Sequence, residues 1–353
     1  MVALDFFCGA GGLTRGLLNA GIRVLIGVDS DGHCRKTFET NNHPAMFLKA
    51  DIRALDYGVI ETHIRDFKRR EVLFAACAPC QPFTKLGIDP VEARQRTLLA
   101  AFGKIVRCFQ PGQILLENVP GLAHVPGAST YHRFLRMLSS VGYQWCHGTL
   151  DAKAYGVAQT RRRLVLMAAK GYKPELPLST HGPRLQPYVT VRDEIACYPP
   201  LRAGEAHPTI PNHAASMLSA LNAERMRHTP ADGGDRRSWP DTLLLPCHIE
   251  HVGHTDVYGR MWWDRPAPAI TGRCNSLSNG RYGHPSQDRA ISFREAASLQ
   301  SFGPSYVFYA PSQRELAGQI GNAVPVRLAE ALGKRLITLN QMSSASRVSK
   351  RSS

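Results

Sequence analysis

The chain has 353 residues, of which 43% are hydrophobic and 20% charged, so it can bury a sizeable core and is not globally disordered. Its 43 Lys and Arg against 28 Asp and Glu give a formal net charge of +15, which favours a polyanionic partner. No apolar run approaches the roughly 18 residues of a membrane span. The first residues carry Asp5 and no basic stretch, which does not predict a secretory signal. Nucleic acid is therefore the expected partner, and no membrane.

The cysteines argue against a disulfide scaffold and against a metal site. There are nine, an odd number, and only Cys77 and Cys80 lie close together in a spacing that metal ligands use. Disulfide frameworks belong to oxidising compartments and to paired cysteines. We therefore expect a reducing compartment such as the cytoplasm or nucleoplasm, and no bound metal.

Short apolar runs alternate with helical patterns over the first 170 residues. This alternation predicts an α/β fold with a mostly parallel sheet that helices cover on both faces. Ligands of such sheets bind at the carboxyl ends of the strands. The predicted strands are 4–7, 24–28, 72–76, 114–117, 143–150 and 164–168, and the predicted helices are about 13–20, 33–41, 94–109 and 129–141.

The pattern changes at about Tyr172, where frequent prolines break any long periodicity. We expect a first domain over 1–171 and a second, smaller one over 172–291. Helical patterns return near 294–299 and 326–339, in a segment taken as 292–340. Residues 341–353 are rich in Ser and basic residues, which predicts a disordered tail.

A glycine-rich turn follows the first predicted strand and opens a helix. Gly9 and Gly11 let backbone N–H groups approach a ligand closely, and Asp29 lies where an acid would bind a ribose. Thr14 replaces the third glycine of the dinucleotide fingerprint, so S-adenosylmethionine is favoured over a nicotinamide cofactor. An ordinary glycine turn explains the stretch about as well. Asp51 is either an adenine contact or a helix N-cap.

Three chemistries compete for the segment around Cys80, which leaves the strand predicted at 72–76. A redox dithiol with Cys77 would open a helix in a small thioredoxin-like unit, which this chain does not contain. A zinc deaminase needs a proline before the first cysteine and an upstream His-x-Glu, and neither is present. The third is a cysteine nucleophile in a turn stiffened by prolines. A buried structural cysteine is the common alternative.

Polar groups at two other strand ends strengthen the nucleophile hypothesis. Glu117 ends a predicted buried strand, where an unpaired charge would be costly, and is a candidate general acid. Arg161, Arg162 and Arg163 precede another strand and offer fixed bidentate donors for phosphates or base edges. A satisfied carboxylate and a solvated basic strand end are the alternatives.

Together these motifs resemble those of the DNA (cytosine-5) methyltransferases of the bacterial restriction-modification type. Six motifs occur in the order and spacing of that family between positions 5 and 325. They are Asp5-Phe-Phe-Cys-Gly9-Ala-Gly11-Gly12, Pro79-Cys80-Gln81, Glu117-Asn118-Val119, Gln159-x-Arg161-x-Arg163, Arg294-Glu295-Ala-Ala-x-Leu-Gln300 and Gln319-Ile-Gly321-Asn322-Ala-Val324-Pro325.

The resemblance implies a doubly wound, S-adenosylmethionine-dependent methyltransferase domain and a target-recognition domain at 172–291, with 292–340 completing the first. It also implies a mechanism. Cys80 adds to C6 of a flipped-out cytosine, Glu117 binds N3 and the amino group, Arg163 contacts the base and Arg161 supports the site.

The resemblance assigns cofactor binding to residues from several motifs. One departure is Ser30, which follows Asp29 where many relatives carry a bulky apolar residue. The assigned residues are Phe7, Gly9, Gly11, Asp29, Asp51, Ile52, Leu98, Asn322 and Val324.

DNA contacts are expected in two places. Residues 81–97 would form a lid over the flipped base, and 260–294 a basic surface that reads the sequence. A solvated connection is the alternative for the first. The expected DNA-contacting residues are Gln81, Lys85, Arg94, Arg96, Arg273 and Arg281.

Three other functions remain open at this point. They are an RNA cytosine methyltransferase, whose Cys-Phe-Thr motif is not found here, a catalytically inactive DNA-binding relative, and a redox protein. The expected partner is double-stranded DNA, with a cognate restriction endonuclease acting on the same site. We expect a monomer in the cytoplasm, associated with the nucleoid in a bacterium.

Overall fold

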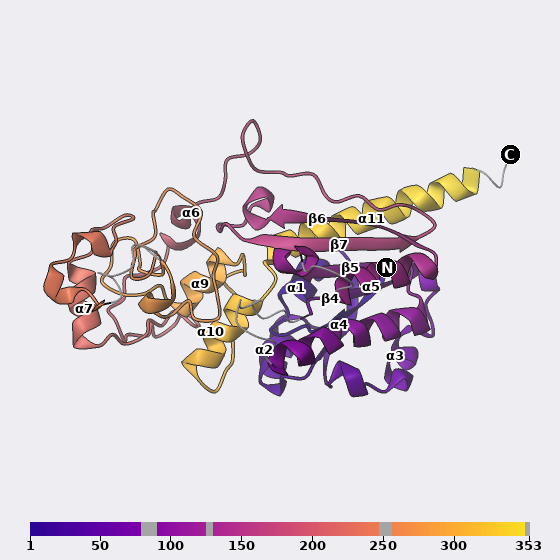
Figure 1. Ribbon diagram of the computed structural model, residues 1–353, viewed down its shortest axis with the longest axis horizontal. Coiled ribbons are helices and arrows are strands. Elements are labelled where there is room, and N and C mark those ends of the chain that lie inside the picture. Colours follow the sequence, from indigo (N-terminus) through magenta and orange to yellow (C-terminus); the bar gives the residue numbers. More distant parts are fainter. Residues whose placement is uncertain (79–89, 125–129, 247–255, 350–353) are drawn as a thin grey trace. The chain divides into compact units, whose positions relative to one another are not determined.

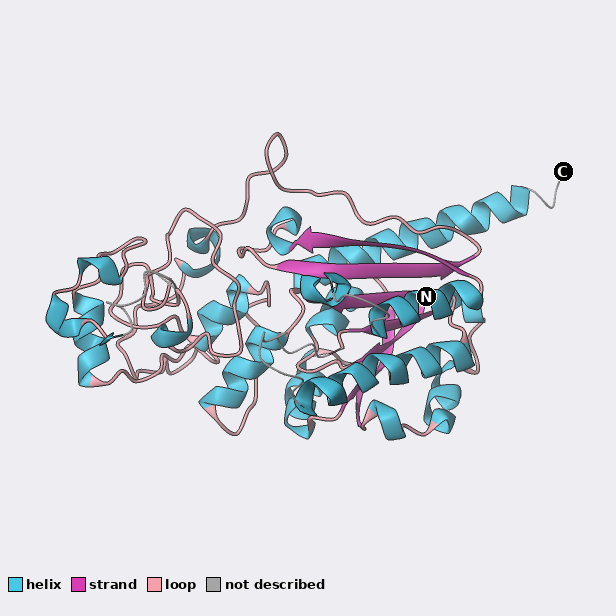
Figure 2. Ribbon diagram, in the orientation of Figure 1, coloured by secondary structure: helices cyan, strands magenta, loops and turns pink. Residues whose placement is uncertain are grey.

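The computed structural model describes residues 1–78, 90–124, 130–246 and 256–349; the side chains of 90–96, 124 and 346–349 lie outside this description. Contacts divide the chain into two compact units, shown with all elements in Figures 1 and 2. Unit 1 comprises Met1–Asp151, Arg162–Ser179 and Val326–Ser353. Unit 2 comprises Ala152–Arg161 and Thr180–Pro325.

Unit 1 is built on a mixed sheet in which seven described strands have the order β3-β2-β1-β4-β5-β7-β6. The first five strands along this order are parallel, and β7 is antiparallel to both of its neighbours. The mostly parallel α/β fold predicted from the sequence is therefore confirmed. The strands are β1 Val2–Phe6, β2 Arg23–Asp29, β3 Met46–Lys49, β4 Val72–Ala76, β5 Gln113–Asn118, β6 Tyr143–Asp151 and β7 Arg162–Lys170.

One face of this sheet packs against three helices in a single apolar core. Alternate strand residues such as Leu4, Phe74 and Leu116 point to α3 (Tyr57–Ile64), α4 (Pro90–Phe109) and α5 (Thr130–Ser140). This period of two is what a sheet with buried strands requires. Because the strands are apolar on both faces, they also bury their other side.

The opposite face carries α1 (Gly12–Asn19), α2 (Arg35–Asn41) and α11 (Val326–Ser349). A Cβ at Gly27 of β2 would lie 2.4 Å from the Phe38 ring of α2. A Cβ at Gly16 would lie 2.3 Å from Cβ of Ala329 and 2.6 Å from the Val326 carbonyl oxygen. Helices α1 and α11 therefore cross at a point where only glycine fits.

Two elements of unit 1 were not predicted, and two helices extend into segments for which another structure was expected. The sequence pattern predicted no strand at β3 and no helix at α3. Helix α4 begins at Pro90, so residues 90–97 are helical where a lid loop was expected; a proline in the first helical turn suits this start. Helix α11 continues to Ser349, so residues 341–349 differ from the expected disordered tail. Extending a formed helix costs little, and Ser is only mildly unfavourable in one.

Unit 2 is mostly irregular, with short helices α6 (Val191–Ile195), α7 (Ala220–Arg227), α9 (Phe293–Leu299) and α10 (Gln313–Asn322). Its small apolar core includes Met226, Trp239 and Tyr258. A buried pair supports it further, because Arg289 donates from Nη2 to Glu295 Oε1 at 2.7 Å, with both side chains at most 1% exposed.

The division by contacts differs from the expected domain boundaries. The junctions lie at 179/180 and 325/326 rather than 171/172 and 291/292, and 152–161 belongs to unit 2. The reason is that α9 is tied into unit 2: Ser298 hydrogen-bonds Tyr198 at 2.8 Å, and Glu295 pairs with Arg289.

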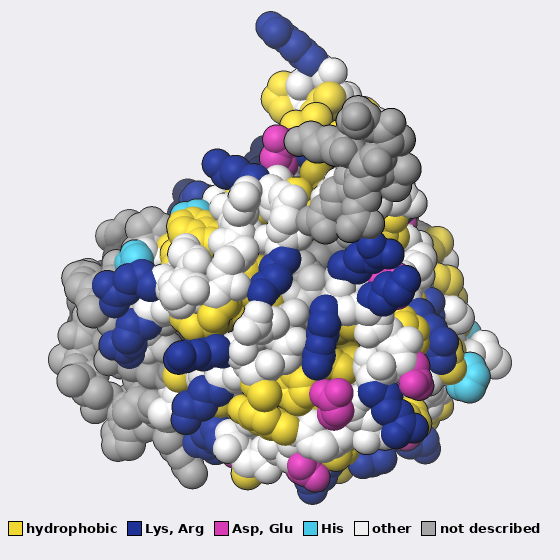
Figure 3. Space-filling model, turned by 90° about the vertical axis from the view of Figure 1, so that its right-hand side faces the viewer, with side chains coloured by type: hydrophobic (Ala, Val, Ile, Leu, Met, Phe, Trp, Pro, Cys, Tyr) yellow, Lys and Arg dark blue, Asp and Glu magenta, His cyan; other side chains and the backbone are white. Residues whose placement is uncertain are grey.

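Charge is distributed over the surface with an excess of basic groups. On the face shown in Figure 3, Lys and Arg side chains are spread widely, with few Asp and Glu side chains among them. Within the described residues, no helix is both long and apolar enough to cross a membrane.

Candidate active site

The polar residues singled out in the sequence gather at one edge of the sheet in unit 1. Strands β1, β2, β4 and β5 are parallel and end there. Strand β7 runs the opposite way, so its first residues, Arg162 and Arg163, lie at the same edge. In α/β sheets the ligand site lies at this edge, where the strand order reverses on either side of β1 and β4.

The glycine turn after β1 is closed onto Asp29. The Gly9 N–H donates to Asp29 Oδ2 at 2.8 Å, and the Asp31 N–H donates to Oδ1 at 2.9 Å. Phe7, Gly9 and Gly11 all have positive φ, at 62°, 49° and 90°. Burial raises the pKa of Asp29, although these N–H groups favour its charged form. The carboxylate is thus oriented by backbone donors and keeps lone pairs for a ligand hydroxyl.

Thr14, which replaces the third glycine, holds a second acid behind this turn. Its hydroxyl donates to Asp5 Oδ2 at 2.6 Å, and the Asp5 side chain is 0% exposed. Burial raises the pKa of Asp5 to about 7. Thr14 therefore has a structural role in this fold, since its hydroxyl binds one oxygen of a buried carboxyl beneath the loop.

Asp51 and Ile52 follow β3 at the same edge. Asp51 accepts from the Arg53 N–H at 2.9 Å and pairs with the Arg53 guanidinium, so it caps the short 3-10 turn Ile52–Ala54. The capping alternative raised by the sequence is therefore observed. A ligand contact by Asp51 would have to share the carboxylate with Arg53.

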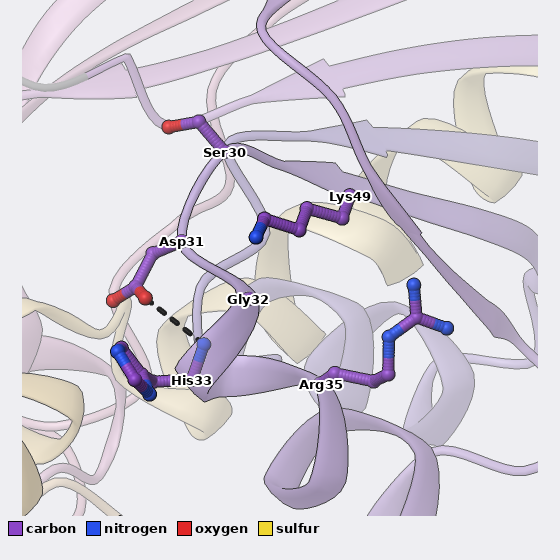
Figure 4. A pocket seen from close by; sticks show the side chains of 6 residues that line it. All are labelled: Ser30, Asp31, Gly32, His33, Arg35 and Lys49. Atoms are coloured by element: carbon purple, nitrogen blue, oxygen red, sulfur yellow. Dashed lines mark hydrogen bonds between the residues drawn. The ribbon is translucent and has the colours of Figure 1, made fainter.

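A pocket of about 530 Å³ opens beside the end of β2 (Figure 4). Figure 4 shows Lys49 reaching across Gly32, and a Cβ at Gly32 would lie 3.0 Å from Cδ of that side chain. The Asp31 side chain accepts from the His33 N–H at 3.0 Å and fixes the turn. The pocket is lined by Ser30, Asp31, Gly32, His33, Arg35 and Lys49. It begins at Ser30, where relatives are expected to carry a bulky apolar side chain.

The remaining expected cofactor residues lie in different parts of the chain. Leu98 on α4 is half-buried and packs against the core of unit 1. Asn322 ends α10 and is exposed, whereas Val324 is 3% exposed; both belong to unit 2.

Glu117 at the end of β5 contacts a different side chain through each of its carboxyl oxygens. The thiol of Cys77 donates to Glu117 Oε2 at 2.9 Å, and Arg163 Nε lies 3.0 Å from Oε1 as an ion pair. The Glu117 side chain is 2% exposed and that of Arg163 is 16% exposed. The three predicted strand ends β4, β5 and β7 are thus brought together by their side chains.

The Gln-x-Arg-x-Arg motif spans the boundary between the units. Gln159 donates to the Leu299 carbonyl at 2.9 Å and accepts from the Ile270 N–H at 3.0 Å. Arg161 donates to the carbonyls of Ile270 at 2.5 Å and Gly321 at 2.8 Å. These two side chains organise unit 2, whereas Arg163 alone reaches Glu117.

Some expected site residues lie outside the described part of the structure. Cys80, Gln81 and Lys85 fall in 79–89, and the side chains of Arg94 and Arg96 on α4 are not described. Ala78, the last described residue before 79–89, is held by Asn118, whose Nδ2 donates to the Ala78 carbonyl at 2.9 Å.

The two arginines expected to read DNA have different surroundings. Arg273 is exposed in a turn of unit 2. Arg281 is 4% exposed, donates to Asp256 Oδ1 at 2.9 Å and to the Gly233 carbonyl at 2.9 Å, and stacks on Trp262 at 4.3 Å. A base contact by Arg281 would break this network. Burial and these contacts indicate a structural role for Arg281 beside the expected DNA contact.

Sequence reasoning missed Cys77 and Asp5 as members of the site. The signal for Cys77 lies in the register: Ala76 pairs with Leu116 in parallel strands, so Cys77 and Glu117 each follow one residue later. Asp5 lies in a strand that is otherwise apolar. Because successive strand residues point to opposite faces, Asp5 lies on the face opposite to Leu4 and Phe6, which is the face that α1 covers. No group of three or more His, Cys, Asp or Glu within the described ranges could hold a metal ion.

Comparison with known proteins adds to this geometry. The family described as C-5 cytosine-specific DNA methylase matches residues 1–338. The chain is 38% identical over 338 residues to "Type II methylase M.HgiDII" of Herpetosiphon aurantiacus, covering 94% of each chain. It is 31% identical to "Type II methyltransferase M1.HphI" of Haemophilus parahaemolyticus, covering 96% of this chain and 87% of that one.

A solved structure shares the fold at lower identity. It is a putative prophage-encoded DNA modification methyltransferase of Escherichia coli, with a TM-score of 0.76 and 20% identity, covering 97% of this chain and 99% of that chain.

Proposed function

Because the chain belongs to the C-5 cytosine-specific DNA methylase family, we propose that it transfers the methyl group of S-adenosylmethionine to C5 of cytosine within a short duplex sequence. The chain is a DNA (cytosine-5) methyltransferase of the Type II restriction-modification kind. The observation that best supports the finer proposal is Glu117, held between the Cys77 thiol and Arg163 on the strand next to the one that leads to Cys80.

In the proposed mechanism, the C5 carbon of cytosine is activated by covalent addition. The Cys80 thiolate adds to C6, and Glu117 stabilises the adduct by binding N3 and the exocyclic amine, so that C5 gains nucleophilic character. When bound, S-adenosylmethionine would supply an electrophilic methyl group for C5, and its sulfonium sulfur would leave as a neutral thioether. A base then removes the C5 proton, and the Cys80 sulfur leaves C6 as thiolate. Arg163 holds Glu117 and contacts the base, and Arg161 is assigned a supporting role.

We assign cofactor binding to the turn after β1 and the acids at the ends of β2 and β3. A Cβ at Gly9 would meet nothing within 4 Å, so this loop borders open space beside Asp29. An oriented Asp29 suits the ribose hydroxyls, and the absence of a third loop glycine suits a nucleoside without pyrophosphate. The proposed cofactor-binding residues are Phe7, Gly9, Gly11, Asp29, Asp51, Ile52, Leu98, Asn322 and Val324.

We assign recognition of the DNA sequence to residues 180–291 of unit 2, adjusting the expected 172–291 to the observed boundary. The proposed DNA contacts are Arg273 there and Gln81, Lys85, Arg94 and Arg96 in unit 1. The proposed partner is double-stranded DNA, with the chain acting as a monomer beside a restriction endonuclease that cuts the same site. The proposed compartment is the one that holds the chromosome, the cytoplasm of a bacterium.

The deciding experiment expresses the chain in a bacterial host without cytosine methylation of its own, and maps methylated cytosines in its DNA and RNA by bisulfite sequencing. We expect 5-methylcytosine in DNA, at one short sequence. Methylation confined to RNA, or none with a folded protein that binds S-adenosylmethionine, would contradict the proposal.

Cys80→Ala tests the covalent step in vitro. We expect loss of methyl transfer with DNA binding retained, whereas the control Cys146→Ala on β6 keeps both. A duplex with 5-fluorocytosine at the target should form a denaturation-resistant adduct with the unsubstituted enzyme, because fluorine cannot leave as a proton does. An adduct mapped to Cys77 would overturn the assignment.

A further inference from the structure

Cys77 is a thiol next to the catalytic centre that the proposed reaction does not use. It follows the last residue of β4, and Glu117 follows the residue paired with Ala76 on the parallel strand β5. Backbone register therefore places the two side chains opposite each other, and Sγ approaches Oε2 to 2.9 Å. The contact does not depend on a flexible loop, because both residues are anchored by the central strands of the sheet.

The surroundings keep this thiol in its protonated form. Burial, and after it the charge of Glu117, raise the pKa of Cys77 well above its ordinary value, and Arg163 offsets this only in part. A thiol with a raised pKa is a poor nucleophile and a steady hydrogen-bond donor. Cys77 thus suits the opposite role from the one proposed for Cys80, three residues on.

The Cys77 thiol and the Arg163 guanidinium each contact a different oxygen of the Glu117 carboxylate. Oε2 accepts from Cys77 at 2.9 Å and Oε1 faces Arg163 Nε at 3.0 Å. A carboxylate has about four acceptor positions, so the two contacts leave others for a ligand. With both oxygens engaged, the carboxyl plane cannot rotate freely, and its remaining lone pairs keep one direction.

From this geometry we propose that Cys77 is a positioning residue, whose thiol orients the Glu117 carboxyl toward N3 and the exocyclic amine of the target cytosine. The inference rests on the proposed function, because it acts through the role of Glu117 in the adduct. Hydrogen bonds of an acid that must be placed within a fraction of an ångström contribute chiefly to the rate of the chemical step. Cofactor and DNA affinity should depend on other residues.

The test compares Cys77→Ala, which removes the donor, with Cys77→Ser, which keeps a donor of similar size. Single-turnover methyl transfer is measured on the full chain with saturating DNA and S-adenosylmethionine, and rates are normalised to the concentration of S-adenosylmethionine-binding sites. This normalisation prevents a partly folded preparation from imitating a catalytic defect. Cys146→Ala, which removes a thiol of β6 that does not contact Glu117, is the matched control.

We expect Cys77→Ala to lower the transfer rate at least tenfold with KM for both substrates within about twofold of the unsubstituted enzyme. Cys77→Ser should recover to within about threefold of the unsubstituted rate, and Cys146→Ala should match it. An alanine variant at full rate would overturn the inference, as would a folded serine variant as slow as alanine. No transfer by the unsubstituted enzyme would instead contradict the proposed function, so the two failures are distinguishable.

Discussion

Asp29 shows how a glycine loop can hold a single side chain in one orientation. Backbone N–H groups of Gly9 and Asp31 each donate to one of its oxygens, so the carboxylate is held in place before any ligand arrives. Such preorganisation lowers the entropy lost on binding. The remaining lone pairs are then available for charge-assisted hydrogen bonds to hydroxyl groups.

Replacing Asp29 by Ala should weaken S-adenosylmethionine binding about tenfold or more. The physical reason is the loss of a charge-assisted contact worth about 1.5–3 kcal/mol. Isothermal calorimetry on the purified chain measures the change. The control is Asp56→Ala, which removes an exposed acid that caps α3 by accepting from the Gly58 N–H. Equal affinity of the Asp29 variant and the unsubstituted chain would remove Asp29 from the cofactor site.

Asp5 should make stability depend on pH in an unusual direction. Its pKa is raised to about 7 by burial, against an ordinary value of 3.8, so the folded chain holds a proton that the unfolded chain releases. Below pH 3.8 both states are protonated and no cost arises. As pH rises toward 7 the unfolded state binds fewer protons, so Asp5 lowers the free energy of unfolding, by at most about 4 kcal/mol.

Asp5→Asn removes that titration and keeps an acceptor for the Thr14 hydroxyl. We therefore expect the free energy of unfolding of the variant, relative to the unsubstituted chain, to rise between pH 5 and pH 8. Urea midpoints measured in parallel at both pH values provide the comparison. A difference between the two proteins that stays constant with pH would show that Asp5 is not the titrating group.

At the scale of elements, the sequence predicted those strands and helices that have a clear hydrophobic pattern. Six strands and the helices at α1, α2, α4 and α5 were located from apolar runs bounded by turns, since buried parallel strands read as continuous hydrophobic segments. Strand β3 and helix α3 were missed. Met46–Lys49 spans only four residues and ends in Lys49, and α3 has a weakly amphipathic pattern that a window of helical length does not resolve.

Site residues at the ends of strands could be predicted from the sequence. The side-chain partners of a residue, which lie far away along the chain, could not. Glu117 and Arg163 were chosen because each adjoins a buried strand, and the structure brings them within 3.0 Å. Arg281 appeared equivalent to Arg273 in the sequence. Only the fold shows that Arg281 is buried against Asp256 and Trp262, because these partners lie 25 and 19 positions away along the chain.

The crossing of α1 and α11 yields a prediction about packing. Gly16→Ala should destabilise the chain by about 1–3 kcal/mol, because its Cβ would lie 2.3 Å from Ala329 Cβ and 2.6 Å from a backbone oxygen. This exceeds the gain of about 1 kcal/mol that Ala normally brings to a helix interior. Thermal unfolding followed by circular dichroism measures the shift.

The matched control is Gly318→Ala in α10, where a Cβ would meet nothing within 4 Å. There the helical preference of Ala acts alone, and the melting temperature should stay level or rise slightly. A Gly16 variant as stable as the Gly318 variant would mean that α11 shifts without cost.

At the scale of the whole chain, we expect the affinity for DNA and the recognition of its sequence to depend on different features. The excess of basic residues favours binding to any duplex, whereas the sequence is recognised by one unit. A net charge of +15 attracts any duplex, and contacts to phosphate carry no sequence information. The residues assigned to the chemistry in unit 1 are proposed to bind the cofactor and the cytosine. Under the proposed function, we therefore expect discrimination between sequences to come from exposed side chains of unit 2 that meet base edges.

Arg273 is the side chain of unit 2 that we expect to contact a base edge. It is exposed, and it forms no ion pair with any residue in the described ranges, whereas Arg281 is held by Asp256 and by backbone carbonyls. Arg273→Ala should cost about 1–3 kcal/mol at a single base pair and relax the methylated sequence there. Arg281→Ala should instead lower the melting temperature, because it leaves Asp256 and several carbonyls without their donor. Genome-wide bisulfite maps of cells expressing Arg273→Ala report the first effect, with the exposed Arg314 of α10 replaced by Ala as the control for loss of a positive charge. Thermal unfolding of purified Arg281→Ala reports the second. A uniform loss of methylation with Arg273→Ala, at every site and with a flatter salt dependence, would make Arg273 a phosphate contact and move sequence reading to other residues of 180–291.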